Sequence, residues 1–434
     1  MENTFPHYQQ EGASGVSRRR CTLYIVIGLL ILNAALAAVL LRGESGNAQE
    51  KIRSRDSRQY PEIQQLLAGG ATADPFAFFK NLAREKGARY AFDVLKVAPI
   101  PSGTDMHLLG HTVGDELYRQ EGTEGVKICT QDFRNACSHS IVVGLFQDKG
   151  EQALDEITEA CRKAPGGKGA YTMCFHGLGH GILAATGYDL EKAVAICEKT
   201  GAREAHKNLV GQDEMPQCVS GAVMEMIGGG FHNKGLWKKQ REKYINRAHP
   251  LLPCASNFIP QEARPLCYNY LTPWLLEASG TDLGKPTPRD FEKAFPLCDT
   301  VPAEERENRR ACYGGFGKEF VVLVKERDIR AVDDMTDQQL STIYQWCLYA
   351  AHEEGIAACT LSALSSLYWG GENKRETSVR FCKLITDARH RSACFGNLTG
   401  AVGFYIDDPS YRTAFCAQLP EEHRGECRSR RLAR

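Results

Sequence analysis

The order of apolar and polar residues along the chain predicts helices. In the segment YDLEKAVAIC, residues 188–197, the apolar positions recur at i, i+3, i+4 and i+7, namely Leu190, Ala193, Val194 and Cys197. This spacing places them on one face of a helix. Alternating runs joined by hairpin turns, which indicate β-strands, do not occur as a series. We therefore expect an all-α fold, an α-solenoid of disulfide-bridged two-helix repeats after an N-terminal transmembrane helix.

A recurring segment supports the repeat prediction. It is rich in small residues and begins at Cys137, Cys174, Cys218, Cys267, Cys312, Cys359 and Cys394, with an earlier unit that starts at Asp105 instead of a cysteine. Successive cysteine starts lie 35 to 49 residues apart, which is typical of two-helix repeats. Each unit predicts a first helix that packs closely on its neighbours, often followed by a more charged second helix.

One unit resembles a known repeat class. The segment CFHGLGHGILAATGYDLEKAVAIC, residues 174–197, is similar to Sel1-like repeats, cysteine-rich relatives of tetratricopeptide repeats. The likeness is carried by Gly187, Asp189, Lys192, Ala193 and Cys197. Later units differ in length and contain additional prolines. The resemblance implies an adaptable scaffold for protein interactions and names no partner.

An uninterrupted apolar run near the N-terminus predicts a membrane anchor. Residues 21–41 contain no charge and are long enough to cross a bilayer. Arg18, Arg19 and Arg20 precede them and favour a cytoplasmic N-terminus, so the remainder would be periplasmic or extracellular. A cleaved signal peptide is the alternative, with small residues at Ala35 and Ala37.

Changes in composition divide the chain further. We expect a cytoplasmic tail (1–20), the transmembrane anchor (21–41), a polar spacer (42–60), a helical cap (61–104) and a helical-repeat domain (105–434).

Cysteine spacing predicts a ladder of disulfides. Sixteen of the 17 cysteines form eight short-range couples, namely Cys129/Cys137, Cys161/Cys174, Cys197/Cys218, Cys254/Cys267, Cys298/Cys312, Cys347/Cys359, Cys382/Cys394 and Cys416/Cys427. Disulfides persist in oxidising compartments, which agrees with export. A within-hairpin register, such as Cys174 to Cys197, would leave Cys129 and Cys427 unpaired. The loop register pairs all sixteen and is favoured because exported proteins seldom keep unused thiols.

Histidines carry the strongest chemical signal. His107, His139 and His176 stand two residues after the start of their units, while His111 and His180 stand four residues further on. An i, i+4 pair places two imidazoles on one helix face, which suits a divalent transition metal such as zinc, copper or iron. One pair together with His139 is the expected ligand set, since gathering all five around one ion would require tight curvature.

Carboxylates and glycines extend this hypothesis. Asp115 continues the face of His107 and His111 and could add a ligand. Glu225 and Glu319 share one repeat position, seven after their cysteines, and are interpreted as solvated, with a place on the concave face as the alternative. Glycines near the histidines would let helices approach closely. The alternative for each histidine is a structural hydrogen bond to a neighbouring backbone.

Composition restricts the function classes. Lysine plus arginine equals aspartate plus glutamate at 53 each, so no overall charge favours nucleic acid. We expect a membrane-anchored scaffold that binds a protein, peptide or glycan in a concave groove and holds a histidine-lined metal. The alternative is a metal-dependent enzyme, an oxidoreductase or hydrolase, that uses the same histidines.

Overall fold

The computed structural model describes residues 60–69, 74–101, 103–165, 167–200, 214–229, 233–282, 286–330, 335–368, 375–405 and 408–429. Within these ranges every regular element is a helix, so the all-α prediction is confirmed. Contacts divide the chain into two units, Met1–Pro61 and Glu62–Arg434. The predicted anchor at 21–41 and Cys21 lie outside the described residues. None of the helices in the described ranges is long and apolar enough to span a bilayer.

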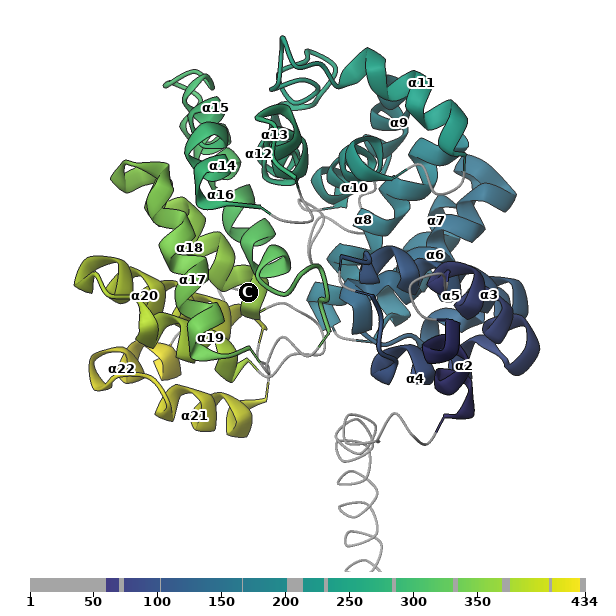
Figure 1. The fold of residues 1–434 in the computed structure, drawn as a ribbon, viewed down its shortest axis with the longest axis horizontal. Helices are drawn as coiled ribbons and strands as arrows, with labels where there is room; N and C mark the ends of the chain where they lie inside the picture. Colours follow the sequence, from purple (N-terminus) through teal and green to yellow (C-terminus); the bar gives the residue numbers. More distant parts are fainter. Residues whose placement is uncertain are drawn as a thin grey trace, which may run out of the picture. The chain divides into compact units, whose positions relative to one another are not determined.

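The recurring segments form a series of repeat helices (Figure 1). These are α5 (Met106–Glu121), α6 (Asp132–Lys149), α8 (Gly167–Ala185), α10 (Glu214–Gly228), the pair α12 (Arg264–Tyr270) and α13 (Thr272–Ala278), α16 (Arg306–Leu323), α18 (Glu353–Tyr368) and α20 (Ala388–Tyr405). Along the chain each packs on the next, from α5 on α6 to α18 on α20. Successive repeat helices are therefore neighbours in space.

The remaining helices lie between the repeat helices or, for α21 and α22, after the last of them. They are α7 (Leu154–Lys163), α9 (Leu190–Cys197), α11 (Lys234–Tyr244), α14 (Pro288–Ala294), α15 (Pro296–Asp299), α17 (Asp337–Cys347), α19 (Glu376–Leu384), α21 (Pro409–Ala417) and α22 (Glu421–Ser429). Short 3-10 helices are η3 (Gly122–Ile128), η4 (Gly150–Ala153), η6 (Gln261–Ala263) and η8 (Leu348–Ala350). In α9 the predicted apolar face is buried. The Asp189 side chain caps this helix by accepting from the Lys192 amide at 3.2 Å.

Three helices precede the repeats, within the segment 61–104 that the sequence predicts to be a helical cap. They are α2 (Pro61–Gly69), α3 (Pro75–Lys86) and α4 (Ala88–Val97). Asp74 caps α3 by accepting from the Phe76 amide at 2.9 Å. Gly87, with φ +93°, ends α3 and separates it from α4. The positive φ that glycine readily adopts explains why residues 75–97 form two helices instead of one.

Glycines let the histidine-bearing helices approach closely. A Cβ atom on Gly177 of α8 would lie 2.6 Å from the Cα of His139 in α6. On the other side of α8, a Cβ on Gly221 of α10 would lie 1.8 Å from the carbonyl oxygen of His176. Larger residues at these two positions would force the helices apart. Close packing around α8 is therefore a direct consequence of glycine at these positions.

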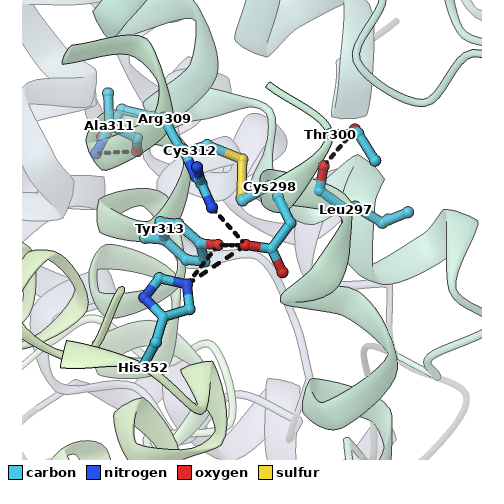
Figure 2. Close-up of a disulfide and its surroundings, with 10 residues drawn as sticks. Leu297, Cys298, Thr300, Arg309, Ala311, Cys312, Tyr313 and His352 are labelled. Atoms are coloured by element: carbon cyan, nitrogen blue, oxygen red, sulfur yellow. Dashed lines mark hydrogen bonds and ion pairs between the residues drawn. A yellow bond between two sulfur atoms is a disulfide. The ribbon is translucent and has the colours of Figure 1, made fainter. Parts of the chain in front are cut away.

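Disulfides join the cysteines in the loop register. The bridges are Cys129–Cys137, Cys161–Cys174, Cys197–Cys218, Cys254–Cys267, Cys298–Cys312, Cys347–Cys359, Cys382–Cys394 and Cys416–Cys427. Most of them tie the end of a short helix to the helix that follows it. Figure 2 shows one example, in which Cys298 of α15 is bonded to Cys312 of α16. The bridges thus stabilise the connection between consecutive helix pairs.

The segment that follows α16 contacts the residues around the start of α5, the first of the repeat helices. The Arg327 guanidinium pairs with Asp105 at 2.8 Å, although more than 200 residues separate them in sequence. Arg330 donates to the carbonyl oxygens of Leu95 and Ala98 at 2.8 and 2.7 Å. These contacts hold the end of α16 beside the start of α5. A cavity therefore lies between the early repeat helices, such as α5, and α16.

Candidate metal centre

Three neighbouring helices bring the five predicted histidines together. α5 carries His107 and His111, α6 carries His139, and α8 carries His176 and His180. Eight pairs of their rings have centroids between 4.7 and 6.4 Å apart. The structure thus gathers all five imidazoles. The sequence predicts a smaller group, because bringing all five together requires tight curvature of the helical array.

One histidine from each helix forms the group best placed to bind an ion. His107, His139 and His180 each offer a ring nitrogen, and these three atoms all lie within 4.8 Å of one another. The expected set was an i, i+4 pair together with His139. The observed group differs from this expected set because α5, α6 and α8 pack side by side. Histidines on separate helices therefore approach one another more closely than the sequence spacing indicates.

Hydrogen bonds fix the orientation of His107 and His180. His107 Nδ1 lies 2.6 Å from the carbonyl oxygen of Phe133, and His180 Nδ1 lies 3.2 Å from Oε2 of Glu225. Both oxygens are acceptors, so Nδ1 carries the proton and Nε2 carries a lone pair. A histidine ligand held in this way by a carbonyl or carboxylate is typical of metal sites.

His111 is oriented by the same principle through a hydroxyl group. The Ser140 hydroxyl donates to the backbone oxygen of His111, so its oxygen accepts from His111 Nδ1 at 3.1 Å. His111 Nε2 then faces His107 Nε2 at 3.2 Å. Two nitrogens bound to one tetrahedral zinc ion are separated by roughly 3.3 Å, given zinc–nitrogen bonds of about 2.0–2.1 Å. Their separation therefore suits a shared ion.

His176 extends the cluster toward a thioether. Ser220 donates to the Gln217 carbonyl oxygen and accepts from His176 Nδ1 at 2.9 Å. The remaining nitrogen, Nε2, lies 3.4 Å from Sδ of Met224. Imidazole and thioether groups both bind copper, so this side of the cluster adds a soft donor.

His139 lies at the centre of the cluster and has the least usual environment. Its side chain is fully buried, and among the described residues neither of its ring nitrogens has a hydrogen-bond partner. Burial of a polar group without a partner costs about 1–3 kcal/mol in proteins. A coordinated ion would satisfy one of these nitrogens.

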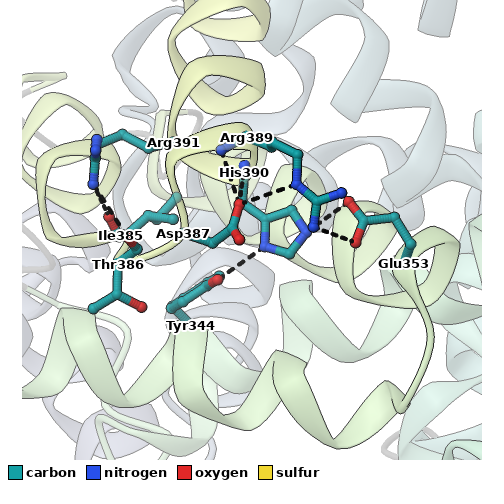
Figure 3. Close-up of polar contacts among 8 residues, drawn as sticks. All are labelled: Tyr344, Glu353, Ile385, Thr386, Asp387, Arg389, His390 and Arg391. Carbon is teal, nitrogen blue, oxygen red and sulfur yellow. Dashed lines mark hydrogen bonds and ion pairs between the residues drawn. The ribbon is translucent and has the colours of Figure 1, made fainter.

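Two other histidines show how this fold accommodates structural imidazoles. His390 is also buried, but its Nδ1 accepts from the Tyr344 hydroxyl at 2.8 Å and its Nε2 donates to Glu353 at 3.0 Å (Figure 3). His352 contacts the Tyr313 hydroxyl at 2.8 Å (Figure 2). Hydrogen bonds to other side chains hold both rings, so both histidines have a structural role. His139 differs from both.

An unusual backbone turn supports the cluster. Within α6, Phe133, Arg134 and Asn135 have φ values of 55°, 55° and 65°, a left-handed conformation that side chains other than glycine rarely adopt. This turn presents the Phe133 carbonyl group to His107 and the Arg134 side chain to the cavity. Strained backbone of this kind concentrates at functional sites.

The histidines line one side of a cavity of about 160 Å³. Its other lining includes Arg134, Tyr270, Lys318, Glu319 and Arg327. Glu225 also lines the cavity, and both glutamates are buried, so their interpretation as solvated carboxylates is wrong. Asp115 is not among the lining residues, whereas Glu225 lines the cavity and contacts His180.

Burial keeps three of the histidines, His107, His139 and His176, in the neutral form that binds metals. It lowers the pKa of His107 to about 4. The pKa values of His139 and His176 are held well below the usual range, chiefly by burial and further by neighbouring imidazoles. Burial also lowers the pKa of Lys318 to about 8. Near pH 7 these three imidazoles are therefore neutral, as metal coordination requires.

The metal-free protein should lose stability as the pH falls below about 6.5. Unfolded histidines bind protons near that pH, whereas buried His139 and His176 resist protonation, so the unfolded state binds more protons. The free energy of unfolding should fall by up to about 1.4 kcal/mol per pH unit for each of these two residues. Urea unfolding near pH 7.5 and pH 5.5 measures this effect, and His139→Leu should reduce the slope. An unchanged midpoint contradicts the prediction.

Some cavity residues share the repeat register of the histidines but were not recognised from sequence. Met224 and Lys318 stand six residues after Cys218 and Cys312, as His180 stands six after Cys174. This shared position was the signal by which Met224 and Lys318 could have been found from the sequence. Arg134 and Arg327 had none, because their positions depend on the left-handed turn and on the segment after α16.

Comparisons with known proteins do not place the chain in a family. No family model matches it, and searches of curated proteins and of solved structures find no match. The histidine geometry is therefore the evidence from which function is inferred.

Proposed function

We propose that this chain binds a divalent transition metal through His107, His139 and His180, and that the bound metal is its functional centre. The environment of His139 supports this most directly. Its imidazole is buried without a hydrogen-bond partner among the described residues, beside the Nε2 atoms of two histidines whose Nδ1 atoms are occupied. A single cation could bind the lone pairs of all three imidazoles.

The ligand set fits an ion that keeps an open position. Catalytic zinc sites use three protein ligands and leave the fourth position to water or substrate. Zinc, copper and iron all accept imidazole, and the bound ion would supply Lewis acidity to a ligand in the cavity. His111 and His176 are then positioned to complete or modify the coordination.

The cavity supports the enzyme alternative over a polymer-binding groove. Its volume of about 160 Å³ is suited to a small molecule, and buried basic and acidic groups face the histidines. We also propose that the helical repeats form a solenoid. This scaffold would hold the three ligand helices in register. Binding of a protein, peptide or glycan elsewhere on the surface stays a prediction.

Location follows from the disulfides and the N-terminal apolar run. Eight bridges require an oxidising compartment, so we infer that residues after the anchor are periplasmic or extracellular. Anchoring through residues 21–41 completes the proposal.

Zinc titration of the full chain tests the proposal. After chelation and dialysis, the protein should bind about one zinc ion per chain with micromolar or tighter affinity near pH 7.5. The expected stoichiometry follows from the one group of three histidines found among the described residues. Failure to bind zinc, copper or iron would reject a metal function.

A further inference from the structure

Lys318 occupies the position of a histidine in its own repeat. It stands six residues after Cys312, as His180 stands six residues after Cys174. Both lysine and histidines line the same cavity, the lysine from α16 and the histidines from α5, α6 and α8. Lys318 therefore faces the same cavity as the histidines, but from α16 on a different side.

The Lys318 ammonium group is buried with little compensation. Its side chain is 15% exposed, and the carboxylate paired with it, Glu319, lies at 3.9 Å. The ammonium nitrogen lies 4.4 Å from the ring centroid of Tyr270, and that ring lies 4.6 Å from the ring of His176. The Tyr270 ring thus contacts both the lysine and the histidine cluster.

The remaining charges of the cavity balance without the metal. Three basic residues and three acidic residues line it, namely Arg134, Lys318, Arg327, Asp105, Glu225 and Glu319. Arg327 already pairs with Asp105 at 2.8 Å, while Glu225 contacts His180 at 3.2 Å. A histidine carries no negative charge in either protonation state, so a divalent ion would leave an excess of at least two positive charges in a buried space. Such an excess is costly unless an anion accompanies it.

We propose that the cavity binds a small organic carboxylate, which coordinates the metal with one end of the carboxylate group and accepts a hydrogen bond from Lys318. This inference rests on the proposed metal centre and names its ligand class. Apolar lining from Val143, Val322 and Ile329 favours a ligand with a short carbon chain over inorganic phosphate. Lys318 is then a specificity-determining residue.

Cobalt(II) and butyrate provide the probes. The full chain is loaded with cobalt, whose visible spectrum reports its coordination, and is titrated with butyrate, phosphate and butylamine. Butyrate should change the spectrum, and phosphate should bind at least about tenfold more weakly. Butylamine should leave the spectrum unchanged because it carries the wrong charge.

Substitutions of lysine identify the anion partner. Lys318→Met should weaken butyrate binding by about tenfold or more, with cobalt content and thermal midpoint close to the parent, since one charge-assisted hydrogen bond is lost. Lys318→Arg should restore most of the affinity. Lys383→Met, at an exposed position of α19, is the matched control and should bind butyrate like the parent.

The outcomes separate the two proposals. A parent protein that takes up no cobalt rejects the metal centre. A parent that binds cobalt but does not respond to butyrate, prefers phosphate, or binds butyrate equally well as Lys318→Met overturns the carboxylate inference while the metal centre stands.

Discussion

Replacement of His139 with leucine should weaken zinc binding by at least about 100-fold and leave the helices folded. Loss of groups that only support a metal ligand commonly costs 10–100-fold in affinity, and loss of a ligand should cost no less. Leucine fills a similar volume and removes two buried nitrogens that have no hydrogen-bond partner among the described residues. The metal-free variant should therefore be as stable as the parent, or more stable by about 1 kcal/mol.

A matched histidine distinguishes ligand from structural residue. His390→Leu leaves the Tyr344 hydroxyl and Glu353 without their contacts to the ring, so it should destabilise the fold by about 1–3 kcal/mol and preserve zinc affinity. Zinc competition assays and urea unfolding measure the two properties separately. If His139→Leu destabilises the fold and retains zinc affinity, then His139 is structural.

The other histidines should give a graded series. His180→Leu should approach the effect of His139→Leu, because both belong to the group of three. His176→Leu should cost less, since its Nε2 contacts Met224. The double variant with alanine at both positions of α8 should have reduced metal content and retain its helical circular dichroism. Equal effects of the two single substitutions would indicate that the i, i+4 pair acts as a unit.

Reduction of the disulfides should unfold the helical fold. The bridges close loops with sequence separations of 8 to 21 residues, and each is expected to contribute about 2–4 kcal/mol. Eight such contributions together exceed the typical stability of a domain, about 5–15 kcal/mol. Far-ultraviolet circular dichroism with and without reductant should therefore show the loss of most helical signal at 25 °C.

Thiol counting provides the control for this experiment. The oxidised chain should contain at most one free thiol, Cys21, and peptide mapping should find Cys161 joined to Cys174. A bridge between Cys174 and Cys197 would reject the register. Many free thiols, or a reduced protein with unchanged thermal midpoint, would reject the stabilising role of the bridges.

Local features of the fold were accessible from sequence because they depend on short-range spacing. The period of the apolar residues predicts α9, and the parity of the cysteines favours the loop register seen in the structure. The break at Gly87 was not anticipated, since an isolated glycine within a helical pattern is often tolerated. The histidines were identified because they recur in the same repeat register.

The arrangement of the site could not be derived from spacing alone. The relative positions of α5, α6 and α8 depend on contacts such as that of Gly177 with His139, which bring one histidine from each helix together. The Phe133 carbonyl group reaches His107 through a left-handed turn that has no sequence signature. Lys318 faces the histidines because distant parts of the chain are joined, for example through Arg327 and Asp105.

Zinc K-edge X-ray absorption of the full chain, loaded with one equivalent of zinc, tests the metal centre most directly. The geometry of His107, His139 and His180 predicts at least three imidazole nitrogens at about 2.0–2.1 Å from zinc, and fewer in His139→Leu. A first shell made of oxygen alone, or one that His139→Leu leaves unchanged, would contradict a metal centre built from these three helices.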